Sequence, residues 1–201
     1  MGRALAPPGA DAVHLCVDMQ KLFAPGAPWA TPWMERVLPQ IVGIVAHAPP
    51  RTVFTRFIPP LTAEDMPGSW KTYYRKWECV TQAVIDPDIY RLMPALEKYA
   101  PPATVIDRMG YSAFGNRALK AYLRTHHVDT LIVSGGETDV CVLASVLDAV
   151  DLGYRVILVE DALCSSSDES HANLMDLYMK RFDIQIEVTQ TARILESWRD
   201  L

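Results

Sequence analysis

The sequence contains no long apolar run. No stretch approaches the roughly 18 consecutive apolar residues that a membrane-spanning helix needs. Residues 1–20 also lack the apolar core of a signal peptide. We therefore expect a cytoplasmic protein that has no membrane partner.

Clustered positive charge is absent as well. Lysines and arginines are scattered along the chain, and the formal net charge is −5. A surface that binds nucleic acid would require a basic patch or stripe. We therefore expect no nucleic-acid partner and a small molecule as the ligand.

Paired metal-binding residues are missing too. The four cysteines form no close Cys/His pairs of the kind that holds zinc. Thiols stay reduced in the cytosol, so each cysteine has to be judged by its own position.

The composition that is present indicates one globular domain. Half of the 201 residues are hydrophobic and 21% are charged, which is enough to build a sizeable core. Neither an internal repeat nor a low-complexity tract divides the chain. We expect a single domain over residues 1–201, with residues 1–11 as a flexible N-terminal segment.

Short β-branched runs alternate with amphipathic stretches along the chain. The predicted strands are Val13–Asp18, Thr52–Arg56, Thr104–Arg108, Thr130–Ser134, Arg155–Glu160 and Ile184–Val188. The predicted helices are Met34–His47, Ile89–Tyr99, Arg117–His126, Asp139–Leu152 and Glu169–Lys180. Since parallel strands need crossover connections, this alternation predicts an α/β fold with helices on both faces of a parallel sheet.

The connection from Phe57 to about Pro87 is long, rich in proline and aromatic residues, and without clear periodicity. Long connections without secondary structure often act as lids or binding loops. Two interpretations stay open: a substrate lid, or a loop whose aromatic residues cover the core or a subunit contact.

The ends of the predicted strands are the first places to look for a site, because ligands of open α/β sheets bind beyond the carboxyl ends of the strands. Asp18 ends the first strand, Asp107–Arg108 end the third, and the fourth leads through two glycines toward Cys141.

Cys141 lies where a helix is expected to begin. Thr138 is a good N-cap, which places Cys141 in the first helical turn, and Gly153 supplies a C-terminal stop. A thiol there faces unpaired backbone N–H groups and the positive end of the helix dipole, which favour the thiolate. Composition alone leaves the alternative of a small buried cysteine that packs the helix against the sheet.

Three segments carry a resemblance to a known family. Ser134–Val142 is similar to the glycine-rich turn, threonine and cysteine of the isochorismatase-like cysteine hydrolases, and Val13–Gln20 resembles their opening strand with its terminal aspartate. Asp148–Ala162 is similar to the family over its whole length. The resemblance implies a Rossmann-like, three-layer α/β/α sandwich with a six-stranded, mainly parallel sheet, and a homo-oligomer.

The resemblance also implies a catalytic triad of aspartate, lysine and cysteine. Asp18 and Cys141 match two of its positions, but Arg108 stands where the family usually has lysine. Arginine keeps the positive charge but is effectively never deprotonated. Arg108 can therefore act electrostatically but cannot transfer a proton. The alternatives are a salt-bridging surface arginine for Arg108 and a capping or turn carboxylate for Asp18.

In the implied mechanism Asp18 takes the proton of Cys141, and the thiolate attacks a carbonyl or imine-type carbon. Backbone N–H groups of the turn at Gly136, Glu137 and Thr138, arranged around a cis peptide Gly136–Glu137, would bind the oxyanion. We expect an aromatic pocket beside Cys141. Its predicted walls are the Phe57–Pro87 connection, with Trp70 and Trp77, together with Phe23, Trp29, Tyr111 and Phe114.

Some members of the family, the nicotinamidases, bind a divalent metal through an aspartate and two histidines after the second strand. This chain has no histidine between His47 and His126, and Glu64 and Asp65 alone would make a poor site. We therefore expect no catalytic metal, no cofactor and a function other than nicotinamidase.

The cysteine favours the C–N hydrolases of the family over isochorismatases proper, in which the aspartate acts as acid on a vinyl ether. We expect a hydrolase of a small amide, ureido or carbamoyl compound with a thioester-type intermediate on Cys141. Two alternatives stay open: a vinyl-ether hydrolase that uses Asp18, and a weakly active or inactive ligand-binding member because of Arg108. Arg56, Arg75 and Arg108 are candidate anchors for a substrate carboxylate, and only Arg108 is well placed.

Overall fold

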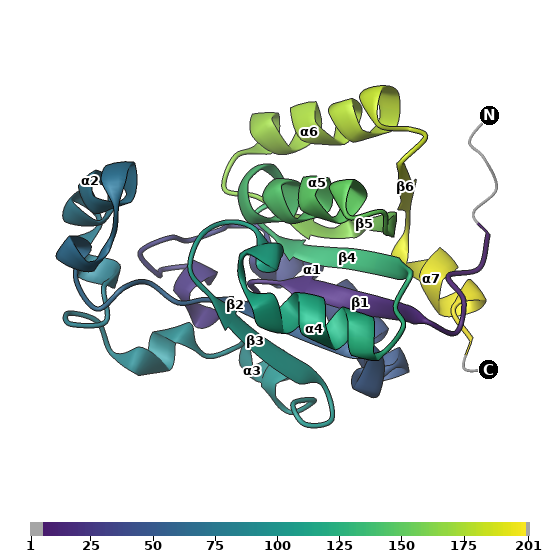
Figure 1. Cartoon of the computed structure of the whole chain (residues 1–201), viewed down its shortest axis with the longest axis horizontal. Coiled ribbons are helices and arrows are strands. Elements are labelled where there is room, and N and C mark those ends of the chain that lie inside the picture. The colour runs from purple at the N-terminus through teal and green to yellow at the C-terminus, as the bar shows by residue number, and fades with distance from the viewer. Residues whose placement is uncertain (1–5, 200–201) are drawn as a thin grey trace.

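The computed structural model describes residues 6–199. Its centre is a six-stranded sheet with the order β3-β2-β1-β4-β5-β6, in which every neighbouring pair is parallel (Figure 1). The strands are β1 Ala12–Val17, β2 Thr52–Phe57, β3 Thr104–Arg108, β4 Thr130–Gly136, β5 Arg155–Cys164 and β6 Ile186–Thr189. The predicted α/β fold with a parallel sheet is confirmed.

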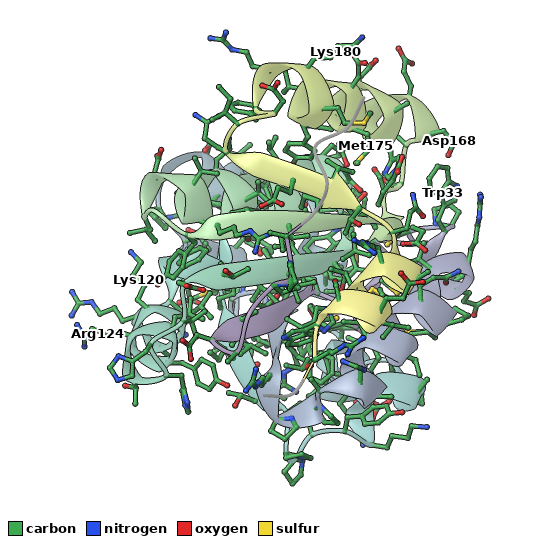
Figure 2. All side chains as sticks on the ribbon, turned by 90° about the vertical axis from the view of Figure 1, so that its right-hand side faces the viewer. Trp33, Lys120, Arg124, Asp168, Met175 and Lys180 are labelled. Atoms are coloured by element: carbon green, nitrogen blue, oxygen red, sulfur yellow. The ribbon has the colours of Figure 1, made fainter. Side chains whose placement is uncertain are left out.

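Helices cover both faces of the sheet. They are α1 Met34–His47, α2 Gly68–Lys76, α3 Pro94–Glu97, α4 Arg117–Thr125, α5 Leu143–Asp151, α6 Asp168–Arg181 and α7 Thr191–Ser197. In Figure 2, Lys120 and Arg124 of α4 project on one side of the sheet, and Trp33 at the start of α1 lies on the other. The central strands β1 and β4 are buried along their whole length because both faces are covered.

The strand order reverses between β1 and β4. The chain builds β1, β2 and β3 toward one edge and then crosses back to place β4 on the other side of β1. The crevice beyond the carboxyl ends of two strands at such a reversal is the favoured ligand site of an open α/β sheet. Asp18 follows β1 directly and Cys141 lies shortly after β4, so the topology brings both residues to this crevice.

The predicted helix Ile89–Tyr99 is wrong. The structure has a 3₁₀ turn at Pro87–Tyr90 and only the four-residue α3 at Pro94–Glu97. Met93 is extended, with φ −54° and ψ 136°, because a residue that precedes proline avoids the helical region. Pro94 therefore interrupts the apolar pattern that favours a longer helix.

The connection after β2 is more ordered than the sequence predicts. It contains the nine-residue helix α2, which stands apart from the sheet layers at the left of Figure 1. A capping box formed by Thr62 and Asp65 starts the preceding 3₁₀ turn, and Glu64 pairs with Lys71 at 3.1 Å and with Arg75 at 2.8 Å. The prediction of a connection without regular structure is therefore wrong, and α7 is a further helix that the pattern did not predict.

Short 3₁₀ turns complete the connections. They lie at Lys21–Phe23, Pro49–Arg51, Ala63–Asp65, Glu78–Val80, Pro87–Tyr90 and Ala113–Gly115. Residues 1–5 of the predicted flexible segment lie outside the described part of the chain, whereas the carbonyls of Ala6 and Pro7 accept hydrogen bonds from Arg155. No helix within residues 6–199 has the length and apolar character to cross a membrane.

Candidate active site

Asp18 is held rigidly where β1 ends. Its backbone has φ +50°, a left-handed conformation that is uncommon for a residue other than glycine and that clusters at functional sites. The side chain is 1% exposed, and Thr55 Oγ1 on β2 donates a hydrogen bond of 2.7 Å to Asp18 Oδ1. The carboxylate is thus a buried, positioned group rather than a solvated turn residue.

Arg108, the last residue of β3, supplies the counterion. One guanidinium nitrogen forms an ion pair with Asp18 Oδ2, and another donates to the carbonyl oxygen of Gly110. The guanidinium carbon lies 5.0 Å from the centre of the Phe57 ring, and the side chain is 0% exposed. Arg108 is therefore buried and paired, which excludes the alternative of a surface arginine.

The turn after β4 brings the chain close to β1. Gly135 has φ +105°, and a Cβ at this position would lie only 2.1 Å from the carbonyl oxygen of Val17. Only glycine fits such an approach. The peptide bond Gly136–Glu137, one residue further along, is cis, as the family resemblance implies.

Thr138 does not cap the helix, so this prediction is wrong. Residues Thr138–Val142 form a π-helical turn whose N-cap is Glu137, and α5 begins after it. Thr138 Oγ1 instead donates to the carbonyl oxygen of Cys164 at 3.1 Å and lies 2.9 Å from His171 Nδ1. The threonine side chain thus ties the turn to β5 and α6.

Cys141 lies in this π-helical turn and is 5% exposed. Burial raises the pKa of the Cys141 thiol, the charge of Asp18 raises it further, and the charge of Arg108 lowers it. The expectation of a thiolate in the resting protein is therefore wrong. At neutral pH the sulfur keeps its proton, beside a carboxylate that can accept it.

The pKa of Asp18 reflects the same burial. Loss of water around the carboxylate raises its pKa, whereas the Arg108 charge and the hydrogen bonds from Thr55 and Cys141 lower it. The protonation of Asp18 therefore depends on that of Cys141, and the cation of Arg108 lies beside both groups.

A cavity of about 340 Å³ opens beside Cys141. Of the six wall residues predicted by name, Phe23, Trp29, Trp77 and Tyr111 line it. The other two do not, which corrects the prediction. Trp70 lies behind the wall, with its ring centre 4.9 Å from that of Tyr111, and the buried Phe114 packs against Tyr154.

Thr55, which orients the carboxylate of Asp18, was not predicted. Its position near the end of a predicted strand was the available signal. Phe57 and Tyr73 of α2 line the cavity, in agreement with the prediction for the Phe57–Pro87 connection. Glu137 was predicted for its backbone alone; it is also one of the residues that line the cavity, and its Oε2 accepts a hydrogen bond from the Ser166 N–H.

The other cysteines differ from Cys141 in their surroundings. Cys16 is fully buried in β1, and burial raises its pKa to about 12. Cys164 is the buried last residue of β5, whereas Cys79 is exposed. Within residues 6–199 no three His, Cys, Asp or Glu side chains are grouped in a way that could hold a metal ion.

Comparisons with known proteins show the family of the chain. A family model described as the isochorismatase domain matches residues 12–190 of the chain. Maleamate amidohydrolase of Pseudomonas putida is 31% identical over 182 residues, which cover 85% of this chain and 80% of that protein. N-carbamoylsarcosine amidase of Arthrobacter sp is 28% identical over 146 residues, or 69% of this chain and 53% of that protein. The solved structure of a cysteine hydrolase from Pseudomonas syringae pv. phaseolicola 1448A has a TM-score of 0.79 at 25% identity, with 98% of each chain covered.

Proposed function

Because this chain belongs to the isochorismatase family, we propose that it is an amidohydrolase that cleaves the C–N bond of a small amide, ureido or carbamoyl compound through a thioester on Cys141. The observation that carries the proposal is the meeting of three buried groups, Asp18, Arg108 and Cys141, beside an aromatic-lined cavity. Relatives named as amidases for maleamate and for N-carbamoylsarcosine support a C–N hydrolase in particular.

The first half of the reaction makes the thioester. Asp18 takes the proton from Cys141 as the sulfur attacks the substrate carbonyl carbon, so a C–S bond forms and the carbonyl electron pair moves to oxygen. When the carbonyl re-forms, the C–N bond breaks and the leaving nitrogen takes the proton from Asp18. Ammonia or an amine departs, and the acyl group stays on the sulfur.

The second half reverses these roles with water. Asp18 accepts a proton from the water that attacks the thioester carbon, and the C–S bond then breaks. The sulfur recovers the proton from Asp18, and the carboxylic acid leaves. No step needs a metal ligand, a redox change or a second substrate other than water.

Two sets of groups stabilise negative charge during the proposed reaction: backbone N–H donors and the cation of Arg108. The backbone N–H groups of the turn at Gly136, Glu137 and Thr138, together with that of Cys141, are the proposed donors to the oxyanion. Arg108 keeps Asp18 ionised in a buried place and stabilises the developing thiolate, in the electrostatic role that lysine fills in the family.

One observation favours a second candidate, a ligand-binding protein with little turnover. The guanidinium of Arg108 is fixed by both Asp18 and Gly110, which lowers the basicity of the proposed base. A vinyl-ether hydrolase is the third candidate, and it would need Asp18 alone.

Ammonia release from a panel of neutral, cationic and anionic small amides and ureido compounds, with maleamate and N-carbamoylsarcosine among the anions, tests the proposal. We expect turnover of at least one compound by the unmodified protein and loss of that turnover in both Cys141→Ala and Asp18→Asn. Turnover that survives in Cys141→Ala would refute the cysteine mechanism. Tight binding of a panel compound without any release would favour the ligand-binding candidate.

A further inference from the structure

Among the described residues that line the cavity beside Cys141, Glu137 is the one with a carboxyl side chain. Glu137 lines the cavity, and its Oε2 accepts a hydrogen bond of 2.8 Å from the backbone N–H of Ser166. Within residues 6–199 its other oxygen, Oε1, has no hydrogen-bond partner, and no lysine, arginine or histidine forms an ion pair with Glu137. A carboxylate with a free oxygen therefore contributes to the surface that a substrate meets.

No cation faces this carboxylate across the cavity. The described lining residues include no lysine, arginine or histidine. Lys76 lies against the Trp77 ring, with Nζ 5.8 Å from its centre, but it is exposed and is not among the lining residues.

The arginines that the sequence offered as substrate anchors are all engaged with acids. Arg56 pairs with Asp107 at 2.6 Å, and Arg75 pairs with Glu64 at 2.8 Å. Arg108 is buried against Asp18, as described above. A carboxylate on the substrate would therefore find no free counterion in the cavity and would meet the like charge of Glu137.

Six of the other residues that line the cavity are aromatic: Phe23, Trp29, Phe57, Tyr73, Trp77 and Tyr111. The ring of Trp29 is the centre of the cluster, with centre-to-centre distances of 5.7 Å to Phe57, 6.0 Å to Tyr73 and 6.0 Å to Trp77. The faces of such rings are electronegative and attract ammonium groups, most strongly where water is excluded.

The pKa values of the two tyrosines that line the cavity, Tyr73 and Tyr111, are affected by the charge of Glu137. Burial raises the pKa of Tyr111, and the charge of Glu137 raises it further. The pKa of Tyr73 is raised by burial first and then by nearby charges that include Glu137. Both phenols therefore remain neutral, so the carboxylate of Glu137 sets the sign of charge in the cavity.

We propose that this cavity selects small amides whose acyl part carries a cationic group such as an ammonium, and that Glu137 discriminates against amides that carry a carboxylate. The proposal rests on the proposed function, since it takes the ligand of the cavity to be the substrate of Cys141. It adds a side-chain role for Glu137 to the backbone role that the family resemblance implies.

Three benzamides of the same shape test the proposal: benzamide itself, para-aminomethylbenzamide and para-carbamoylbenzoate, which are neutral, cationic and anionic at neutral pH. We expect kcat/KM for the cation to exceed that for neutral benzamide by on the order of tenfold, since one close opposite charge in a partly buried site is worth about that factor. The anion should be the poorest of the three. An anion that is hydrolysed as well as the cation would overturn the proposal.

Glu137→Gln separates the charge from the shape of the wall. This change should lower the cation-to-neutral ratio of kcat/KM by on the order of tenfold and should raise the relative rate of the anion. The matched control is Glu78→Gln, which removes one negative charge from an exposed residue beside Trp77 that does not line the cavity. A ratio that changes equally in both variants, or in neither, would refute the assignment to Glu137.

Binding measurements keep this test independent of turnover. Calorimetric titration of Cys141→Ala with the same three compounds reports selection by charge without any chemistry. We expect the cation to bind Cys141→Ala more tightly than the anion does and to lose this advantage in the double variant Cys141→Ala, Glu137→Gln. If that result is found while no compound is hydrolysed by the unmodified protein, the proposed hydrolysis fails and the charge selection stands. Equal binding of cation and anion overturns the charge selection, even if benzamide is hydrolysed.

Discussion

Arg108 stands where the family resemblance implies a lysine, and its buried pair with Asp18 has a physical consequence. A lysine carries its charge on a single ammonium, whereas this guanidinium contacts both Asp18 and the Gly110 carbonyl. Removing the cation would leave Asp18 buried without a counterion, which raises the pKa of the carboxyl.

Substitution of Arg108 should therefore separate charge from shape. Arg108→Lys is expected to keep a measurable fraction of kcat, and Arg108→Met to lose on the order of 100-fold. Because Asp18 must be ionised to take the thiol proton, and Met removes the cation that lowers its pKa, the acid limb of the kcat/KM profile should move to higher pH in Arg108→Met. The pH–rate profiles of the two variants measure this.

Arg56→Met is the matched control for Arg108, because Arg56 pairs with Asp107 outside the cavity and should leave the profile in place. If Lys fails as completely as Met, the planar fork of arginine is the essential feature. A many-fold gain of turnover in Arg108→Lys would identify a compromised enzyme whose task is binding. An unchanged profile in both variants would place Arg108 outside the reaction.

Cys141 should behave as a protonated thiol in the free protein. Burial and the Asp18 charge raise its pKa, so the fraction of thiolate and the rate of iodoacetamide labelling should rise about tenfold per pH unit. We expect this rise to continue to about pH 10, above the ordinary range of a cysteine. A plateau reached by neutral pH would show instead that the resting group is a thiolate.

The labelling experiment needs a background without Cys79. That cysteine is exposed, and it would react before the buried Cys141 at a limiting dose. Cys79→Ser removes the competition, and peptide mapping then follows Cys141 alone.

At the scale of elements, the contact between β1 and β4 fixes the distance between Asp18 and Cys141. Gly135→Ala should lower the free energy of unfolding by more than about 3 kcal/mol, because its Cβ would meet the rigid backbone of Val17. Urea denaturation of the variant measures the loss.

Gly153→Ala is the control for Gly135, because Gly153 has φ +86° but no atom within 4 Å of an added Cβ. Gly153→Ala should lower the free energy of unfolding by about 1–2 kcal/mol, which is the cost of a left-handed conformation for alanine. Equal losses in the two variants would show that the close approach of β1 and β4 does not matter.

The helix α2 and the turn that follows it contribute the outer wall of the cavity. Trp77→Ala removes a lining ring and should raise KM by on the order of tenfold, with a smaller effect on thermal stability. Trp70→Ala removes a ring that packs behind Tyr73 and Tyr111 and should act more on stability than on KM. If Trp77→Ala lowers only the melting temperature or dissociates an oligomer, the aromatic residues of this segment serve the core or an interface.

The elements that the sequence predicts well are those with a local cause. Strand periodicity and the order of elements led to the parallel sheet, and the strand ends together with the family resemblance led to Asp18, Arg108 and Cys141. The predicted helix over Ile89–Tyr99 was wrong because one proline outweighs an apolar pattern, and Thr138 bonds to β5 and α6 instead of capping its own helix.

At the scale of the whole molecule, the missed features depend on contacts between distant segments. The bond from Thr55 to Asp18 follows from the way β1 and β2 pair, and the protonated thiol of Cys141 follows from how completely the chain covers it. Neither the hydrogen bond nor the protonation state can be predicted from a local sequence pattern. The single domain over residues 1–201 and the homo-oligomer remain predictions.

The thioester on Cys141 can be trapped by rapid acid quenching of the protein during turnover of an amide, followed by mass spectrometry of the intact chain and of its peptides. We expect a mass increase equal to the substrate minus ammonia, located on Cys141, which forms and decays fast enough to account for kcat and is absent in Asp18→Asn. Turnover of the same amide with no adduct on Cys141, or with an undiminished rate in Cys141→Ala, would refute the thioester mechanism.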